Sequence, residues 1–137
     1  RYCYQHSPEG ALFAAANAMV QAESGATTTR AWWRYFVSTR APNRSQFINQ
    51  PYGTRPTGVR IGVAGFRLLE YDGRTARVDL GVRADGSGNT AYGSGIYTLV
   101  WEGGDWKLLP SPGPDPLQVA QLPDLAGYIS WGEADGR

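Results

Sequence analysis

The sequence predicts an α+β domain in which two or three N-terminal helices pack on a strongly curved antiparallel sheet of about four strands. Three observations favour this class: apolar residues recur at helical spacing early in the chain, they alternate with polar residues later, and glycine-rich turns separate the alternating runs. The length of 137 residues fits one domain. We expect a single domain, residues 1–137, with helices at about 7–50, a sheet at about 59–109, a proline-rich break at 110–116 and an apolar tail at 117–133.

The first helix is expected to begin at Ser7-Pro8-Glu9. Serine accepts a hydrogen bond from an early amide, proline is tolerated at the first helical position, and glutamate suits the positive end of the helix dipole. Ser24-Gly25 predicts its end, since glycine readily adopts the left-handed cap. The apolar set of this helix is Leu12, Phe13, Ala16, Met19 and Val20.

Two further helices are expected before the sheet. An apolar stripe of Trp32, Trp33, Phe36 and Val37 predicts the second helix. Residues 45–50 predict a short third helix, with its apolar residues facing inward. Prolines and glycines at residues 51–58 then mark a loop.

The strands are predicted from a change of period to two after residue 59. Asp72-Gly73 and Gly103-Gly104 are hairpin turn signals. On the second strand an apolar set alternates with a charged set, so one face is expected to be buried and the other exposed to solvent. The apolar set is Val78, Leu80 and Val82, and the charged set is Arg77, Asp79 and Arg83.

The third strand and the tail carry two further signals. Gly93 and Gly95 lie inside the third predicted strand, where glycine usually marks a bulge or a sharp bend, so we expect strong curvature. Four prolines in residues 110–116 end the regular sheet. The tail that follows is too apolar to stay free and is expected to dock on the body of the domain or on a partner. Its large apolar residues include Leu122, Leu125, Tyr128, Ile129 and Trp131.

Composition argues against several kinds of site. Cys3 is the only cysteine, so no internal disulfide forms, and His6 is the only histidine, so no histidine or cysteine cluster exists for a metal. No pair of titratable residues at usable spacing indicates catalysis. We therefore expect no metal, no cofactor and no catalytic residue.

The first part of the chain is rich in arginine. Seven arginines and no acidic residue lie between Glu23 and Glu70, and aromatic residues lie among them, as in some surfaces that bind nucleic acid or anionic lipid. The aromatic residues fall on a core-like stripe and the arginines are scattered, which favours a solvated face, so nucleic acid is not the expected partner. The weak candidates for a basic face are Arg30, Arg34, Arg40 and Arg44.

Helices followed by long antiparallel strands over residues 7–109 resemble the nuclear-transport-factor-2-like fold, in which a curved sheet wraps a long helix to form a cone. The run Trp-Glu-Gly-Gly-Asp-Trp-Lys-Leu at residues 101–108 is similar to closing hairpins of that superfamily. The superfamily hosts enzymes, scaffolds and ligand binders, so the resemblance implies a fold and leaves the function open.

The opening Tyr-Gln-His-Ser-Pro-Glu-Gly-Ala at residues 4–11 and the end at residues 125–132 carry a second resemblance. They are similar to extracytoplasmic domains of single-pass membrane proteins from actinobacterial mobile elements, which are associated with conjugation. This resemblance implies a non-catalytic scaffold or interaction domain of a conjugation or type IV secretion-like machinery. It implies protein partners, either itself or other machinery components, and a membrane anchor upstream of Arg1.

The candidate interaction surface combines the charged face of the second strand with the apolar tail. The alternative is a small-molecule binder or enzyme that uses the cone interior, for which Tyr35, Tyr97 and Asp79 are the candidate residues. An open cavity with a few polar groups would favour that alternative. The residues of the candidate interaction surface are Arg77, Asp79, Arg83, Leu122, Leu125, Tyr128 and Trp131.

Overall fold

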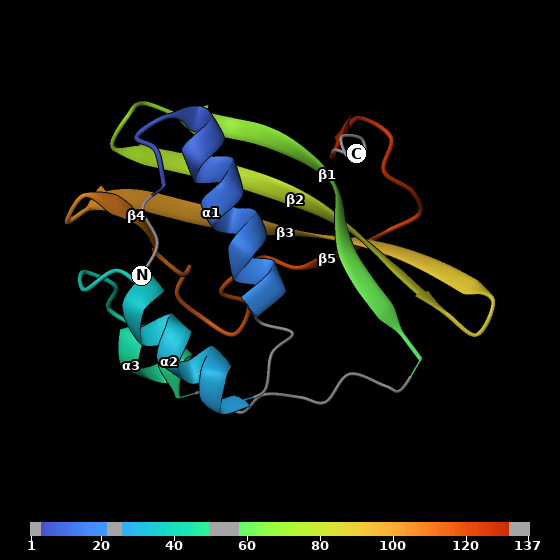
Figure 1. The fold of residues 1–137 in the computed structure, drawn as a ribbon, viewed down its shortest axis with the longest axis horizontal. Helices are drawn as coiled ribbons and strands as arrows, with labels where there is room; N and C mark the ends of the chain where they lie inside the picture. Colours follow the sequence, from blue (N-terminus) through green and yellow to red (C-terminus); the bar gives the residue numbers. More distant parts are fainter. Residues whose placement is uncertain (1–3, 22–25, 50–57, 132–137) are drawn as a thin grey trace.

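The computed structural model describes residues 4–21, 26–49 and 58–131 of the chain. In these residues three helices pack on one face of an antiparallel sheet of six strands (Figure 1). The α+β class, with helices before an antiparallel sheet, is therefore confirmed. The elements are α1 Pro8–Gln21, α2 Ala26–Phe36, α3 Arg44–Ile48, β1 Arg60–Tyr71, β2 Thr75–Gly86, β3 Asn89–Glu102, β4 Asp105–Leu108, β5 Ala120–Leu122 and β6 Ile129–Ser130.

The start of α1 agrees with its sequence signal. The backbone N–H of Gly10 donates to Oγ of Ser7 at 3.0 Å, which caps the first turn. Figure 1 shows α1 lying across the sheet, with α2 and α3 together on the side of β4. The predicted cap at Ser24-Gly25 lies outside the described residues. The face of α1 that is fully buried is made of alanines, which let the helix approach the sheet closely: Ala11, Ala14, Ala15 and Ala18.

The hydrophobic core fills the space between the helices and the inner face of the sheet. The predicted stripe of α2 and of the residue that follows it is buried, and so are Phe47 and Ile48 of α3. Val78 and Leu80 face this core as predicted, whereas Val82 is only partly buried. The largest core side chains include Trp106, Phe36, Leu80, Leu99 and Leu108.

The sheet differs from the expected one in curvature and strand number. Its order is β4-β3-β2-β1-β6, with β5 paired to β3, so it has six strands in the described residues rather than about four. It is not strongly curled. The β2–β3 ladder runs in unbroken register from Thr75↔Val100 to Gly86↔Asn89, so Gly93 and Gly95 introduce no bulge. The register shifts lie in β1 instead.

The two additional strands come from the tail. We call residues 117–131 the strap, because they pair with both edges of the β1–β2–β3 sheet and cross its outer face between them. At one edge β5 pairs with β3, and the N–H of Ile96 donates to the carbonyl of Leu117 at 2.7 Å. At the other edge β6 pairs with β1, and the N–H of Trp131 donates to the carbonyl of Ala64 at 3.0 Å. The tail therefore docks on its own sheet.

Glycines in the strands make room for the strap. Gly65 and Gly81 are direct partners in the β1–β2 ladder. A Cβ atom on Gly81 would lie 2.9 Å from Cδ2 of Leu125, and one on Gly65 would lie 3.0 Å from Cβ of Tyr128. A Cβ on Gly93 would lie 3.1 Å from the carbonyl oxygen of Ala120. Close approach of the strap, rather than a bend of the sheet, explains these glycines.

Candidate functional site

Asp79 was predicted to be solvent-exposed on the outer face, and that prediction was wrong. Its side chain does point to the outer face, but the strap covers it, and only 3% of the residue is exposed. The hydroxyl of Tyr128 donates to Oδ2 of Asp79 at 2.8 Å, and Nη2 of Arg67 donates to the same atom at 2.8 Å. The Arg67 guanidinium carbon lies 4.5 Å from the centre of the Tyr128 ring.

This cluster joins the strap to the sheet. Burial raises the pKa of Tyr128, and its hydrogen bond to Asp79 raises that pKa further. The hydrogen bond with Asp79 raises the pKa of Arg67. The other carboxylate oxygen, Oδ1, is buried and has no hydrogen-bond partner in the structure. The charge of Asp79 is therefore balanced on one side only, by Arg67 of β1 and by the hydroxyl of Tyr128, and the second of these donors depends on the strap being in place.

The remaining residues of the predicted interaction surface are not gathered into one patch. Arg77 lies 3.9 Å from Glu70, and Arg83 lies 3.0 Å from Asp85, in ion pairs on either side of the strap. Such solvent-exposed pairs contribute little to stability. The strap residues Leu122, Leu125, Tyr128 and Trp131 are partly buried on the protein's own body.

The four arginines considered for a basic face have separate environments. Arg44 donates from Nη2 to the carbonyl of Arg34 at 2.7 Å and from Nε to that of Val37 at 3.4 Å, so it satisfies carbonyls at the end of α2. Arg40 lies 3.6 Å from Glu102. Arg34 is exposed, and Arg30 is partly buried. At least two of the four thus support the fold.

Glu102 fastens the segment after α2 to the β3–β4 hairpin. Oγ of Ser38 donates to Oε1 of Glu102 at 2.5 Å, and Thr39 donates to Oε2 from Oγ1 at 2.8 Å and from its N–H at 3.1 Å. Burial alone would raise the pKa of Glu102, but these hydrogen bonds outweigh burial and lower it. No pattern in the sequence indicated this contact, because its partners lie more than sixty residues apart.

The tyrosines considered for catalysis are held inside the fold. Tyr35 donates from its hydroxyl to Oδ2 of Asp105, and the same carboxylate accepts from the N–H groups of Tyr4 and Trp106, each at 3.0 Å. Asp105 thus joins α2, the N-terminal segment and β4. Burial raises the pKa of Tyr97 to about 12. These tyrosines and carboxylates are used in packing and hydrogen bonding within the fold.

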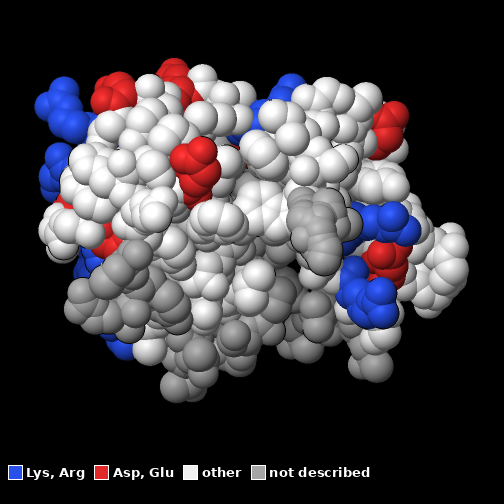
Figure 2. Space-filling model, turned by 45° about the horizontal axis from the view of Figure 1, so that its top comes forward, with Lys and Arg blue, Asp and Glu red and all other residues white. Residues whose placement is uncertain are grey.

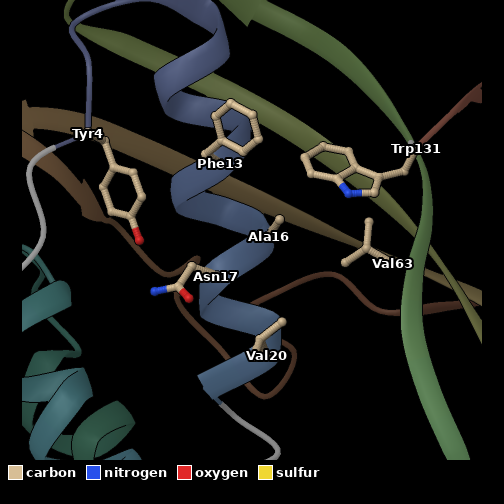
Figure 3. A pocket seen from close by; sticks show the side chains of 7 residues that line it. All are labelled: Tyr4, Phe13, Ala16, Asn17, Val20, Val63 and Trp131. Carbon is tan, nitrogen blue, oxygen red and sulfur yellow. The ribbon is translucent and has the colours of Figure 1, made fainter. Parts of the chain in front are cut away.

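A hollow on the described surface lies at the sheet edge, between α1 and β1 (Figure 3). It has a volume of about 460 Å³, and no acidic, basic or histidine side chain lines it. Trp131, at the end of the strap, forms one wall and meets Phe13 and Phe66 edge-on, with ring centroids 5.7 and 5.6 Å apart. Its lining residues are Tyr4, Phe13, Ala16, Asn17, Val20, Val63 and Trp131.

Large apolar side chains stay exposed around this groove. Phe13 and Val20 of α1 are each 56% exposed, and Ile129 of β6, which pairs with Phe66, is 60% exposed. Leu68 is exposed two residues beyond Phe66 on β1. We call this surface the apolar edge; it consists of Phe13, Val20, Leu68, Ile129 and Trp131. In Figure 2 charged side chains gather mainly toward the two ends of the visible face, and the middle is largely uncharged.

The apolar edge was not predicted, because Phe13 and Val20 were grouped with Ala16 and Met19 in one apolar set of α1, of which Ala16 and Met19 are buried and Phe13 and Val20 are exposed. The signal was present in the alanines at 11, 14, 15 and 18, which form a face of small residues at helical spacing. Small residues allow the closest approach to a sheet, so the larger apolar residues are left at its side. Asn17 also lines the groove, and its buried Nδ2 has no hydrogen-bond partner among the residues that the structure describes.

Two smaller grooves also lie on the described surface. One, of about 370 Å³, lies beside the proline-rich segment, and the other, of about 250 Å³, lies over β1 and β2. Neither Asp79 nor Asp105 lines any of the three grooves. In the described ranges no three side chains of histidine, cysteine, aspartate or glutamate gather as metal ligands. No helix in those ranges is long and apolar enough to cross a membrane.

Comparison with known proteins gives one match. A family model described as Domain of unknown function (DUF8175) matches residues 1–130, which is nearly the whole chain. No curated protein and no solved structure matches the chain.

Proposed function

The chain belongs to the DUF8175 family, and we propose that this member is a non-catalytic domain that assembles with protein partners through its apolar edge. The observation that carries the proposal is the concentration of exposed apolar side chains around an uncharged groove. Isolated exposed apolar residues are ordinary, but a contiguous group of them usually marks an interaction site.

The strap also supports a partner site at the apolar edge, because it covers other surfaces of the sheet. The helices cover the inner face of the sheet, and the strap crosses its outer face and pairs with both edges. One side of the domain that this arrangement leaves open is the side where α1, β1 and β6 meet. Phe13, Val20 and Leu68 were not expected to form one surface with Ile129 and Trp131 of the tail, so the proposed site differs from the one predicted from the sequence.

The setting we propose is the extracytoplasmic part of a membrane-anchored component of a conjugation or type IV secretion-like machinery. Its support is the resemblance of residues 4–11 and 125–132 to such domains. A relationship to the nuclear-transport-factor-2-like superfamily belongs to the same proposal and is supported by element order. The strongly curved cone expected from that fold is absent.

A non-catalytic role is supported by the hydrogen bonds of two buried carboxylates, which are made within the fold. Asp79 accepts hydrogen bonds from Arg67 and Tyr128, and Asp105 accepts them from Tyr35 and two backbone amides. Neither carboxylate lines a groove, whereas a general acid or base must reach the substrate.

A second candidate function is the binding of a small molecule in the groove. The buried Nδ2 of Asn17 favours it, because a ligand carbonyl could accept from this group. The volume of about 460 Å³ is also in the range of ligand sites. This site lies at the sheet edge and not inside a cone, where core side chains fill the space.

Site-specific photo-crosslinking in the full-length protein tests the proposed function. A photoreactive amino acid is placed in turn at Val20, Ile129 and, as a control, at the exposed Asn89 of the β2–β3 turn. We expect protein adducts from positions 20 and 129 and none from position 89. Equal yields at the three positions, or no adducts at any, would contradict an interaction through the apolar edge.

A further inference from the structure

We propose that the apolar edge is the interface of a symmetric dimer, in which a second copy of this chain covers it. This rests on the proposed function and names the partner that occupies the same surface. Three features of the surface favour a second copy over a different protein: its shape, its lack of charge and the open strand beside it.

The shape of the apolar edge allows it to pair with itself. Phe13 and Ile129 protrude, with 56% and 60% of their surface exposed, and a groove of about 460 Å³ lies beside them. In a two-fold dimer the same patch meets itself, so each protrusion of one copy must find a hollow on the other. A patch that holds both a protrusion and a hollow meets that requirement.

The charge distribution is also compatible with self-association. None of the residues that line the groove or form the apolar edge is acidic or basic. When a patch pairs with itself, each charge near the symmetry axis faces a like charge, which opposes association. A partner chosen by charge complementarity would need a charged group to recognise here, whereas the cores of homodimer interfaces are apolar.

An open strand borders the same surface. β6 is the last strand of the sheet, so one side of it has no neighbouring strand in the described residues. Successive residues of a strand direct their backbone groups to alternate sides, and Trp131 donates to Ala64 of β1. The backbone groups of Ser130 therefore face outward. An open edge is a template for another strand, and two copies of β6 related by a two-fold axis run antiparallel.

Sedimentation equilibrium of the 137-residue chain tests the dimer. The wild-type chain is compared with Val20→Ser and Ile129→Ser, which each place a polar group on the proposed interface. Val119→Ser is the matched control, because Val119 is 66% exposed and lies beside β5 at the opposite edge of the sheet. Circular dichroism and thermal unfolding confirm that all variants fold alike. A variant that fails this check is replaced by the milder Val20→Ala or Ile129→Ala.

We expect a reversible monomer–dimer equilibrium whose dissociation constant rises about tenfold or more in Val20→Ser and Ile129→Ser and changes less than about twofold in Val119→Ser. A chain that stays monomeric up to about millimolar concentration overturns the inference. A dimer that is unaffected by both interface variants, or weakened equally by the control, also overturns it.

Different experimental results would overturn the dimer and the proposed function. If position 20 forms adducts with another protein in cells while the purified chain is monomeric, the dimer is wrong and the interaction surface stands. If adducts are absent and the chain is monomeric, both are wrong. Adducts between two copies at positions 20 and 129, together with a dimer sensitive to those variants, support both.

Discussion

The carboxylate of Asp79 is buried beneath the strap, and its environment explains why the strap stays docked. Arg67, its direct partner in the β1–β2 ladder, supplies the countercharge, and Tyr128 supplies a hydroxyl donor from the strap. A buried carboxylate is costly unless it is paired and hydrogen-bonded. Lifting the strap removes one of these donors, so the cluster couples the strap to the sheet.

Replacement of Tyr128 by phenylalanine tests this coupling. We expect Tyr128→Phe to lower the free energy of unfolding by about 1–3 kcal/mol, because a buried acceptor that already has an unpaired oxygen loses a donor. Urea denaturation measures the change. Tyr92→Phe is the control, since no hydrogen bond of its hydroxyl is found in the described residues. Equal effects of the two substitutions would show that the hydroxyl of Tyr128 contributes nothing specific.

Glu102 makes stability depend on pH. Its pKa in the folded protein is below the ordinary value of 4.5, so folding favours the ionised form. The stabilisation is fully present well above pH 4.5 and is lost as the pH falls from there through the lower folded-state pKa. We expect Glu102→Gln to reduce the free energy of unfolding at pH 7 and to flatten its decline below pH 5, relative to Glu70→Gln. If the free energy of unfolding of Glu102→Gln declined below pH 5 as steeply as that of the wild type, Glu102 would not be the source of this pH dependence.

Alternation along β2 correctly placed Asp79 on the face away from the core. It could not predict burial, because the covering residue, Tyr128, is 49 positions away and no local pattern links the two. Glu102 and its donors were missed for the same reason. Residue-scale expectations thus held where they depended on a strand's own period and failed where a distant segment supplied the environment.

The strap covers part of the outer face of the sheet and therefore determines which surfaces of the sheet remain accessible to a partner. Its two pairing segments, β5 and β6, have three and two residues, and between them Leu125 and Tyr128 lie against Gly81. Edge strands this short gain little from their own hydrogen bonds. Close contact over the glycines therefore contributes much of the docking, together with the Asp79 cluster.

A pair of glycine substitutions tests the contact directly. A Cβ at Gly81 would lie 2.9 Å from Leu125 and 3.1 Å from Tyr128, whereas one at Gly62 would meet nothing within 4 Å. We expect Gly81→Ala to cost about 1–3 kcal/mol more than Gly62→Ala, or to release the strap to proteolysis. The measurements are urea denaturation and limited digestion. Similar stability and similar digestion of the two variants would contradict the proposed fit.

The long elements were predictable because their periods extend over many residues. Helix α1 begins at Pro8, inside the predicted start at Ser7-Pro8-Glu9, and β1 to β4 span residues 60–108, where a sheet at about 59–109 was expected. β5 and β6 were not predicted, since three or two residues carry no period. The apolar set expected on α1 divides in the structure, where Ala16 and Met19 are buried beside the other alanines and Phe13 and Val20 are exposed.

The whole molecule has its inner face closed by helices and its outer face crossed by its own tail. The interaction surface expected from the charged face of β2 and the tail is thereby divided, with Asp79 buried and Arg77 and Arg83 on either side of the strap. The apolar edge keeps apolar side chains from α1, β1 and β6 exposed in the described residues. The function that we propose at this scale is an assembly role.

The class of the fold was predictable from element order, but the curvature of its sheet was not. Glycines inside strands are consistent with a bend or with close approach of another segment, and only the position of the strap distinguishes the two. The identity of a partner depends on the shape of a surface formed by α1, β1 and β6 together. Because these three elements are far apart in the sequence, no local sequence pattern predicts the shape of that surface.

Native-state amide hydrogen exchange tests most directly the claim that the tail is part of the fold and leaves the apolar edge as the interface. The N–H of Ile96 donates to Leu117 of the strap, that of Tyr128 donates to Leu125 within the strap, and that of Trp131 donates from the strap to Ala64 of β1. We predict that these amides exchange at least about a hundredfold more slowly than in an unstructured peptide at low protein concentration, where any dimer has dissociated. Exchange of Tyr128 and Trp131 at the unstructured rate under those conditions would show a free tail and would contradict the account.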